Sequence, residues 1–268
     1  GEGLFFGLGS LVKFPADFTA APHSVIAAGV TTLPQRVEFP FSLINTPSEV
    51  FANTSPALNE ISPAWVLSHS LYQIRRNDEK HRQQYQARHD NLDFETFSTE
   101  TIRLMQVALE RLEAATDQPV YSGDDITGLG KNVMSRKSLG NAVETYRFFI
   151  NWYALCRLKQ RLELLGVAAN SPQANDCLQE HTDDVDWTLA QQILDGRADI
   201  PGMLEELRAG ERTITESIKE SKTRDDQRVN RIFGGSAPPT TPADDDAFVR
   251  LSRNAFDRLS QEIDALLE

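Results

Sequence analysis

HSVIAAGVTTLPQRVEFPFSLINTPSEV, at residues 23–50, has the clearest β pattern in the chain, and the predicted fold depends on it. Aliphatic residues alternate there with small residues, as where Val25-Ile26 precedes Ala27-Ala28-Gly29. Gly29 suits a tight turn because a residue without Cβ adopts positive φ readily. Pro40 has no amide donor and belongs at the edge or the end of a strand. The pattern predicts short strands separated by turns, and an ordinary short β-hairpin with an aliphatic core is the alternative.

The segment resembles the closing coil of a hexapeptide-repeat acyltransferase, a left-handed parallel β-helix built from six-residue units. Its exit strand and turn are Val37–Pro47. A wider resemblance is carried by Phe14–Pro47, EISPAWVL at 60–67, Arg75-Arg76-Asn77 and Gly130-Lys131-Asn132. These features are similar to an uncharacterised bacterial family that joins a left-handed β-helix, sugar-nucleotidyltransferase-like or acyltransferase-like, to a helical C-terminal region. The resemblance covers most of residues 1–166.

The predicted fold class is mainly α with a short β start, formed by the last coils of a left-handed parallel β-helix. The expected domains are terminal β-helix coils at 1–50, a helical domain at 51–233, a flexible linker at 234–246 and a C-terminal amphipathic helix at 247–268. A repeat architecture needs about three units to be stable, and at most two coils are visible. We therefore expect a C-terminal fragment that lacks the catalytic residues, because the catalytic His of the resembling transferases lies in earlier coils.

Beyond residue 50, apolar residues recur at three- and four-residue spacing, which predicts amphipathic helices. The clearest pattern is at 136–165, where Val143, Phe149 and Leu158 belong to a broad apolar stripe and Gly166 suits the end of a helix. Other helices are expected at 63–88, 99–115, 183–195, from Pro201 onward and at 247–267. GGSAPPTTPADDD, at 234–246, has the composition of a linker.

The net charge of −12 lies mostly in the C-terminal part, where residues 167–268 hold 11 Lys and Arg against 21 Asp and Glu. An acidic surface repels phosphate backbones, so we expect neither nucleic acid nor a membrane as a partner. No run of about eighteen apolar residues predicts a membrane span. Cys156 and Cys177 give no disulfide framework, which favours a reducing, cytoplasmic setting.

A basic cluster on the expected helix at 63–88 is one candidate binding site. Its members are Arg75, Arg76, Lys80, His81, Arg82, Arg88 and His89. Such a cluster suits the phosphate of a nucleotide sugar or of coenzyme A. Asp78 and Glu79 lie among these residues, so a solvated helix face with i,i+4 ion pairs is the alternative.

Gly128-Leu129-Gly130-Lys131-Asn132 contains the Gly-Lys pair of a phosphate-binding loop. A Walker loop also needs a glycine where Asp125 stands and a Ser or Thr where Asn132 stands, so the comparison fails. Lys131 and Asn132 stay candidate ligand-binding residues, and a flexible loop before the next helix is the alternative.

His23 is a candidate catalytic base for acyl transfer, because the pKa of a histidine lies near neutral. Other candidate binding residues on the closing coil are Ala28, Gly29, Thr31 and Arg36. The five histidines have no metal-ligand spacing, so no metal is expected.

Two functions are open. The resemblance implies acyl or nucleotidyl transfer to an activated sugar, with a coenzyme A thioester or a nucleotide sugar as ligand. In that case the helical part caps the β-helix and aids assembly of a homo-oligomer, a trimer by analogy. The alternative is a non-catalytic structural or oligomerisation module.

Overall fold

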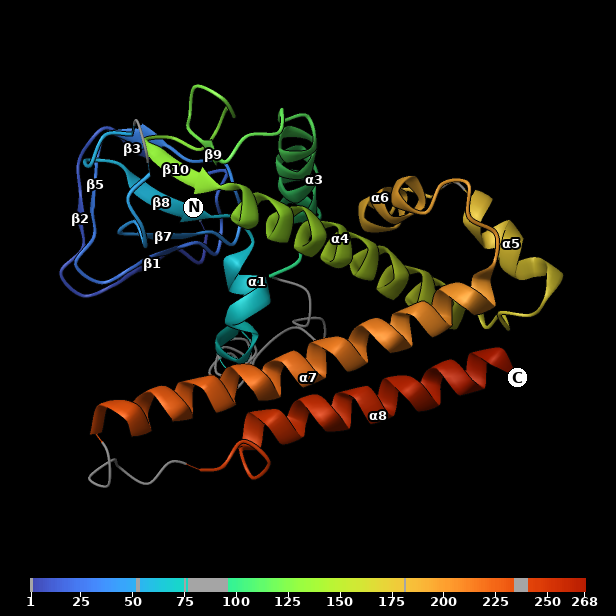
Figure 1. Cartoon of the computed structure of the whole chain (residues 1–268). Helices are drawn as coiled ribbons and strands as arrows, with labels where there is room; N and C mark the ends of the chain where they lie inside the picture. The colour runs from blue at the N-terminus through green and yellow to red at the C-terminus, as the bar shows by residue number, and fades with distance from the viewer. Residues whose placement is uncertain (1, 52–53, 75, 77–95, 181, 234–240) are drawn as a thin grey trace. The chain divides into compact units, whose positions relative to one another are not determined.

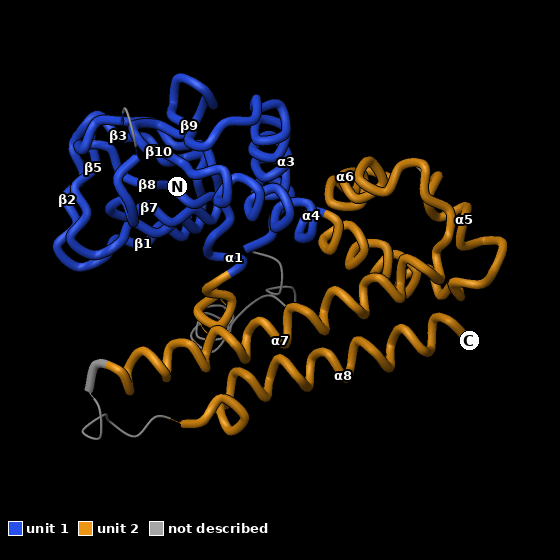
Figure 2. The backbone as a smooth tube through the Cα atoms, viewed as in Figure 1, with its two compact units in different colours: residues 1–68, 96–150 blue, residues 69–95, 151–268 orange. Residues whose placement is uncertain are grey.

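The chain, seen here in a computed structural model, divides into two compact units that each combine two separate stretches of sequence (Figure 2). Unit 1 holds residues 1–68 and 96–150, and unit 2 holds residues 69–95 and 151–268. Helix α4 (Arg136–Leu165) contributes its first half to unit 1 and its second half to unit 2. The structure describes residues 2–51, 54–74, 76, 96–180, 182–233 and 241–268.

Unit 1 begins with short strands that pair in parallel. They are β1 (Phe5–Phe6), β2 (Leu11–Val12), β3 (Ala16–Asp17), β4 (Val25–Ile26), β5 (Thr31–Thr32), β6 (Gln35–Arg36) and β7 (Leu43–Asn45). Phe5 pairs with Val25, and Val25 pairs with Leu43. β2 pairs with β5 and β3 pairs with β6 in the same parallel sense. The strands are short because a turn or a bend begins within a few residues of the end of each of them.

The sheet that contains β1, β4 and β7 continues past residue 50 (Figure 1). β8 (Asn59–Ser62) pairs antiparallel with β7, and β10 (Asn132–Ser135) pairs parallel with β8. β9 (Val120–Tyr121) pairs antiparallel with β10. The result is a mixed six-stranded sheet in the order β1-β4-β7-β8-β10-β9.

The predicted fold class is therefore wrong. The described residues form small mixed and parallel sheets, and no left-handed β-helix is shown among them. The physical reason lies at the second edge of β7, whose unpaired backbone groups need partners. β8 supplies them, with Leu43 opposite Ser62, so β8 returns antiparallel to β7 in the same sheet where a further coil was expected.

Four aromatic rings from distant parts of the sequence stack in the core of unit 1. The ring centroids are 5.1 Å apart for His23 and Phe41, 5.7 Å for Phe41 and Phe97, and 5.5 Å for Phe97 and Phe149. Phe97 lies just before α3 (Thr99–Glu113), and Phe149 lies on α4. This aromatic stack connects the N-terminal strands to both helices.

The helices predicted at 99–115 and 136–165 are confirmed as α3 and α4. Tyr146 on α4 is fully buried, and its hydroxyl donates a hydrogen bond to the carbonyl of Pro40 at 2.6 Å. Burial raises the pKa of this hydroxyl well above its usual value. Of the helix predicted at 63–88, the structure describes α1 (Trp65–His69) and helical residues at 71–74 and 76; residues 75 and 77–88 lie outside the described residues.

Unit 2 is helical. Besides the second half of α4, it contains α5 (Pro172–Gln179), α6 (Val185–Ile193), α7 (Ile200–Phe233) and α8 (Ala247–Leu267). Figure 1 shows α8 running alongside α7. The buried apolar residues of this pair include Leu204, Leu207, Ile214, Ile218, Val249 and Ile263. None of the helices described here has both the length and the apolar character needed to cross a membrane.

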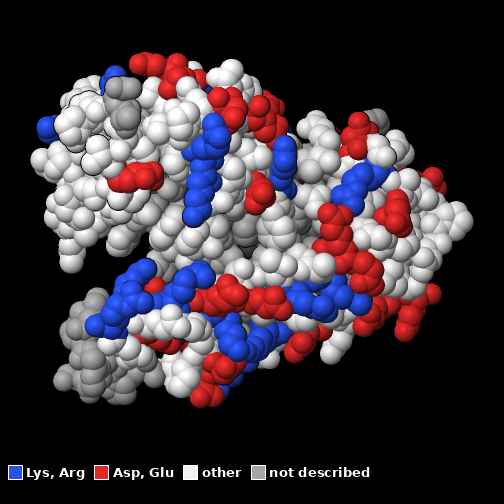
Figure 3. Space-filling view, viewed as in Figure 1, with Lys and Arg blue, Asp and Glu red and all other residues white. Residues whose placement is uncertain are grey.

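Charged side chains in unit 2 form pairs across helices. Lys159 on α4 is almost fully buried, and its ammonium lies 2.6 Å from a carboxylate oxygen of Glu163 and of Glu262. Arg208 on α7 pairs with Asp264 on α8 at 2.5 Å. Figure 3 shows acidic and basic side chains interspersed along α7 and α8. Several basic side chains of unit 2 are thus paired with carboxylates of neighbouring helices.

The residues that lead into α8 are held by side chains of unit 2. The ammonium of Lys222 donates to the carbonyl of Thr241 at 3.0 Å. Asp244 forms ion pairs with Lys219, at 2.8 Å, and with Arg253. The earlier part of the expected linker, at 234–240, lies outside the described residues.

Candidate functional site

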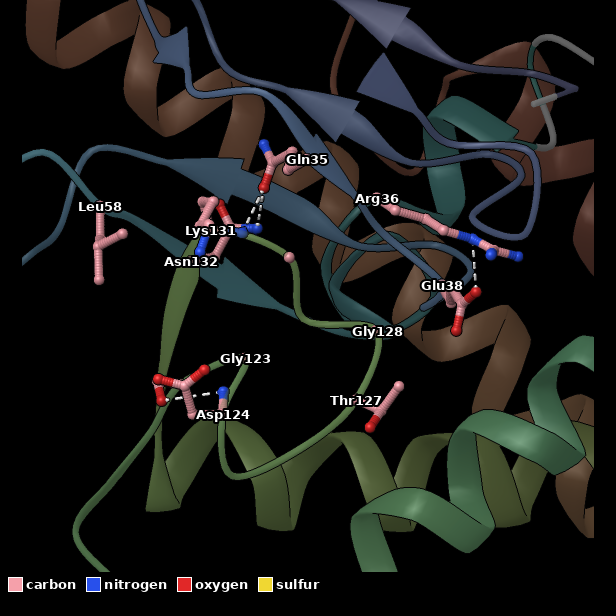
Figure 4. A pocket seen from close by; sticks show the side chains of 12 residues that line it. Gln35, Arg36, Glu38, Leu58, Gly123, Asp124, Thr127, Gly128, Lys131 and Asn132 are labelled. Atoms are coloured by element: carbon pink, nitrogen blue, oxygen red, sulfur yellow. Dashed lines mark hydrogen bonds and ion pairs between the residues drawn. The ribbon is translucent and has the colours of Figure 1, made fainter. Parts of the chain in front are cut away.

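An open pocket of about 390 Å³ lies in unit 1 beside the loop that joins β9 to β10 (Figure 4). We call it the loop pocket. Its lining residues include Gln35, Arg36, Glu38, Asp124, Lys131 and Asn132. The first three come from β6 and the segment after it, and the others come from the loop and the start of β10. A pocket of this size suits a small-molecule ligand.

The shape of the loop depends on glycine. Gly128 has a φ of 96° and Gly130 a φ of 66°, which favour a residue without a side chain. A Cβ atom on Gly130 would lie 2.6 Å from Oε1 of Gln35. At the start of the loop, Asp125 accepts hydrogen bonds from the amide and the hydroxyl of Ser122. Hydrogen bonds from Gln118 and Ser122 lower the pKa of the Asp125 carboxyl.

Gln35 fixes the end of the loop to β6. Its Oε1 accepts hydrogen bonds from the Lys131 amide at 2.9 Å and from Nδ2 of Asn132 at 2.8 Å. Nδ2 of Asn132 also donates to the carbonyl of Leu129 at 2.5 Å. The backbone amide of Lys131 is therefore already bonded within the protein. The side chain of Lys131 is the group that this residue presents to a ligand.

Buried polar atoms lie beside these bonds. Gln35 and Asn132 are both buried. Nε2 of Gln35 and Oδ1 of Asn132 have no hydrogen-bond partner within the described residues. One donor and one acceptor of this pair of side chains are thus left without a partner among the described residues.

Charges on the other side of the loop pocket come from Arg36 and Glu38, which Figure 4 shows next to one another. Nε of Arg36 lies 2.7 Å from Oε1 of Glu38 and 3.3 Å from Oδ2 of Asp17. The Arg36 side chain is 66% exposed, so its guanidinium keeps donors free for a ligand. The loop pocket therefore presents both basic and acidic groups.

The structure brings three of the predicted site residues together, since Arg36, Lys131 and Asn132 all line the loop pocket. The other predicted residues that the structure describes do not line it. Thr31 is exposed on β5, and its carbonyl accepts a hydrogen bond from Asn59. Ala28 and Gly29 are exposed at the turn before β5. Arg76 belongs to unit 2, and Arg75 lies outside the described residues.

His23 lies in the aromatic stack of unit 1. Its residue is partly buried, and Nε2 is buried with no hydrogen-bond partner in the described part of the chain. Burial lowers the pKa of the imidazole to about 4, so His23 is neutral at pH 7. Its ring packs on Phe41 and does not line the loop pocket.

Sequence reasoning missed Gln35, Glu38 and Asp124 as site residues. Gln35 is 96 positions from Lys131, and no local pattern connects the two. The pair of glycines at 128 and 130 was the one sequence signal for this site, because it marks a loop with unusual backbone conformation. Within the described residues, no group of three or more His, Cys, Asp or Glu is placed to hold a metal ion.

Comparison with known proteins gave no relative: no family model, no curated protein and no solved structure matches the chain. The resemblance to an uncharacterised bacterial family therefore stays a prediction. Function must be inferred from the chemistry of the loop pocket and of the exposed surfaces.

Proposed function

We propose that unit 1 binds a phosphorylated sugar in the loop pocket, as part of a protein that transfers an acyl or nucleotidyl group to an activated sugar. The observation that carries the proposal is the side chain of Lys131. It is exposed, lines the loop pocket, and forms no ion pair within the described residues. An ammonium group without a carboxylate partner is available to bind phosphate.

The remaining lining residues suit the two chemical parts of such a ligand. Arg36 adds a second cation for phosphate oxygens. The Asp124 carboxylate and the Thr127 hydroxyl are exposed at the loop pocket and suit sugar hydroxyls. The mixture of cations and carboxylates therefore favours a sugar phosphate over an inorganic anion alone.

In acyl transfer, a coenzyme A thioester would give its acyl group to a sugar hydroxyl or amine and leave as coenzyme A. In nucleotidyl transfer, a nucleotide sugar would give its nucleotidyl group to a sugar phosphate and release its own sugar phosphate. Both donors carry phosphates, which suit the side chains of Lys131 and Arg36. We place the protein in the cytoplasm, in keeping with the buried free thiols of Cys156 and Cys177.

A thermal-shift titration of the purified chain tests the proposal. The ligands are UDP-N-acetylglucosamine, glucose 1-phosphate, acetyl-coenzyme A and, as the uncharged reference, glucose. A ligand that binds only the folded protein stabilises it, by about 2.7 kcal/mol at a hundredfold excess over Kd. We expect at least one phosphorylated ligand to raise the melting temperature and glucose to leave it unchanged.

Lys131→Ala should weaken binding of that ligand about tenfold, because a charge-assisted hydrogen bond is lost. Lys137→Ala is the matched control: Lys137 is an exposed lysine of unit 1 on α4 that does not line the loop pocket. This control should bind like the wild type. Equal affinities for Lys131→Ala and the wild type would contradict the proposed site.

A second function, assembly of a homo-oligomer, is favoured by an apolar edge of unit 1. We use that name for Phe5, Phe6, Leu8, Leu11 and Phe14, whose residues are 49–91% exposed. Within the described residues, β1, β2 and β3 each pair with one neighbouring strand, and these side chains lie on or beside those strands. Open apolar edges associate with other chains.

Light scattering of the purified chain tests assembly. We expect an oligomer for the wild type and a monomer after Phe5→Ser, Leu8→Ser and Phe14→Ser are combined. Leu164→Ser with Val185→Ser removes exposed apolar side chains of unit 2 and should keep the wild-type mass. A wild-type monomer, or an oligomer that survives the triple change, would exclude assembly through the apolar edge.

A further inference from the structure

We infer that Glu38 is a positioning residue of the loop pocket, an inference that rests on the proposed function. The Glu38 side chain is 12% exposed and lies between two arginines. Its Oε1 is 2.7 Å from Nε of Arg36, and its Oε2 is 2.5 Å from Nη1 of Arg111. A carboxylate that accepts charged hydrogen bonds through both oxygens fixes the direction of both guanidinium groups.

Glu38 and Arg111 also bond to the backbone of the loop that joins β9 to β10. Nη1 of Arg111 donates to the carbonyl of Thr127 at 3.3 Å, and the amide of Glu38 donates to the carbonyl of Gly128 at 2.9 Å. A Cβ atom on Gly128 would lie 2.6 Å from Nη1 of Arg111. A side chain at position 128 would therefore collide with the side chains of Glu38 and Arg111.

The loop is consequently attached to the β6 segment at two points. Gln35 holds the amide of Lys131, and Glu38 holds the backbone at Gly128, directly and through Arg111. Glu38 also orients Arg36, which lines the loop pocket itself. Loss of the Glu38 charge should therefore disturb Arg36, which is one proposed ligand-binding cation. It should also disturb the loop that carries Lys131, which is the other.

Positioning and simple electrostatics predict opposite results for Glu38→Gln. Removal of a negative charge beside the loop pocket should strengthen binding of an anion if Glu38 acts only through its field. If Glu38 acts by positioning, the freed Arg36 and the loosened loop should weaken binding, because ordering them then costs free energy on association. The direction of the change in Kd distinguishes the two roles.

Calorimetric titration with UDP-N-acetylglucosamine and with glucose 1-phosphate, on the full chain, measures that direction. We expect Glu38→Gln to raise Kd about tenfold. Glu110→Gln is the matched control: Glu110 is an exposed carboxylate on α3, one residue before Arg111, and does not line the loop pocket. Its Kd should equal the wild-type value.

Hydrogen–deuterium exchange without ligand gives a second, independent reading. Exchange at residues 122–131 should be faster in Glu38→Gln than in the wild type, whereas exchange along α4 should not change. Arg111→Gln breaks the same pair from α3 and should loosen the same loop, which keeps the test available if Glu38→Gln folds poorly.

Unchanged or tighter binding by Glu38→Gln, with unchanged loop exchange, would overturn the positioning role and leave the proposed function standing. Failure of the wild type to bind either ligand would refute the proposed function instead. In that case, faster loop exchange in both variants would still support Glu38 as the residue that holds the loop, and unchanged exchange would overturn it.

Discussion

Phe41→Ala should lower the free energy of unfolding of unit 1 by about 3–5 kcal/mol, as expected for removal of a buried aromatic side chain. Phe41 is fully buried, and its ring lies between those of His23 and Phe97 in the aromatic stack. Its amide also donates to the carbonyl of Pro22, and its carbonyl accepts from the amide of Val66. Loss of the ring therefore removes the stacking contacts with His23 and Phe97, which connect the strands of unit 1 to its helices.

Urea unfolding followed by hydrogen exchange of unit 1 peptides measures this loss. Val50→Ala is the control, because it shortens an apolar side chain of unit 1 that is 99% exposed and lies outside the apolar edge. We expect the control to change stability by less than about 0.5 kcal/mol. Similar losses for the two variants would show that the aromatic stack is not the centre of the unit 1 core.

Asp246→Ala should destabilise unit 2 by about 2–4 kcal/mol. The buried Asp246 carboxylate caps α8, accepting hydrogen bonds from the amides of Phe248 at 2.9 Å and Val249 at 3.2 Å. It also accepts a hydrogen bond from the buried hydroxyl of Tyr72 at 3.0 Å. Loss of a cap costs about 1 kcal/mol, and a buried hydroxyl left without a partner costs about 1–3 kcal/mol more.

Asp184→Ala separates these two contributions. Asp184 caps α6 through the amides of Asp186 and Trp187, but its residue is exposed and has no tyrosine partner in the described bonds. We expect a loss of about 1 kcal/mol in thermal or urea unfolding. If the two aspartates cost the same, the Tyr72 bond contributes nothing. Burial is the main cause that raises the pKa of the Tyr72 hydroxyl to about 12, and the hydrogen bond to Asp246 adds to it. A spectrophotometric titration of this hydroxyl therefore reports on the contact.

The helices were predictable because their pattern is local. Apolar residues recur every three or four positions along residues 136–165, in the stripe that includes Val143, Phe149 and Leu158. This pattern identifies α4 without knowledge of its neighbours in the fold. α5 was missed because PQANDCLQ contains few apolar residues, of which only Ala174 and Cys177 are buried. A helix with so small an apolar face has too weak a pattern to be recognised.

The sheet was not predictable, because it depends on pairing between distant segments. β8 and β10 pair in parallel, with Asn132 opposite Asn59, and neither segment shows in its own residues which strand it joins. The exit strand predicted within residues 37–47 is present in part as β7, at residues 43–45. β7 pairs with β4 on one side and with β8 on the other, and only the pairing with β4 fits the predicted arrangement.

The candidate site was predictable in part. Arg36 was predicted as a residue of the closing coil, and Lys131 and Asn132 were predicted from the Gly-Lys pair of the loop; the three line one pocket. Gln35 and Glu38 could not be chosen, since their roles arise from hydrogen bonds to Lys131 and Gly128, about ninety positions away. Side chains that hold a loop have no sequence signal until the fold places them beside it.

Hydrogen–deuterium exchange of the wild-type chain, with and without saturating UDP-N-acetylglucosamine or glucose 1-phosphate, shows directly whether the loop pocket binds a sugar phosphate. We expect slower exchange with ligand at residues 122–132 and 35–38, which surround the loop pocket. The same experiment on Lys131→Ala should show a much smaller change at equal ligand concentration. Protection confined to other parts of the chain, or no protection with either ligand, would contradict a sugar-phosphate site in the loop pocket.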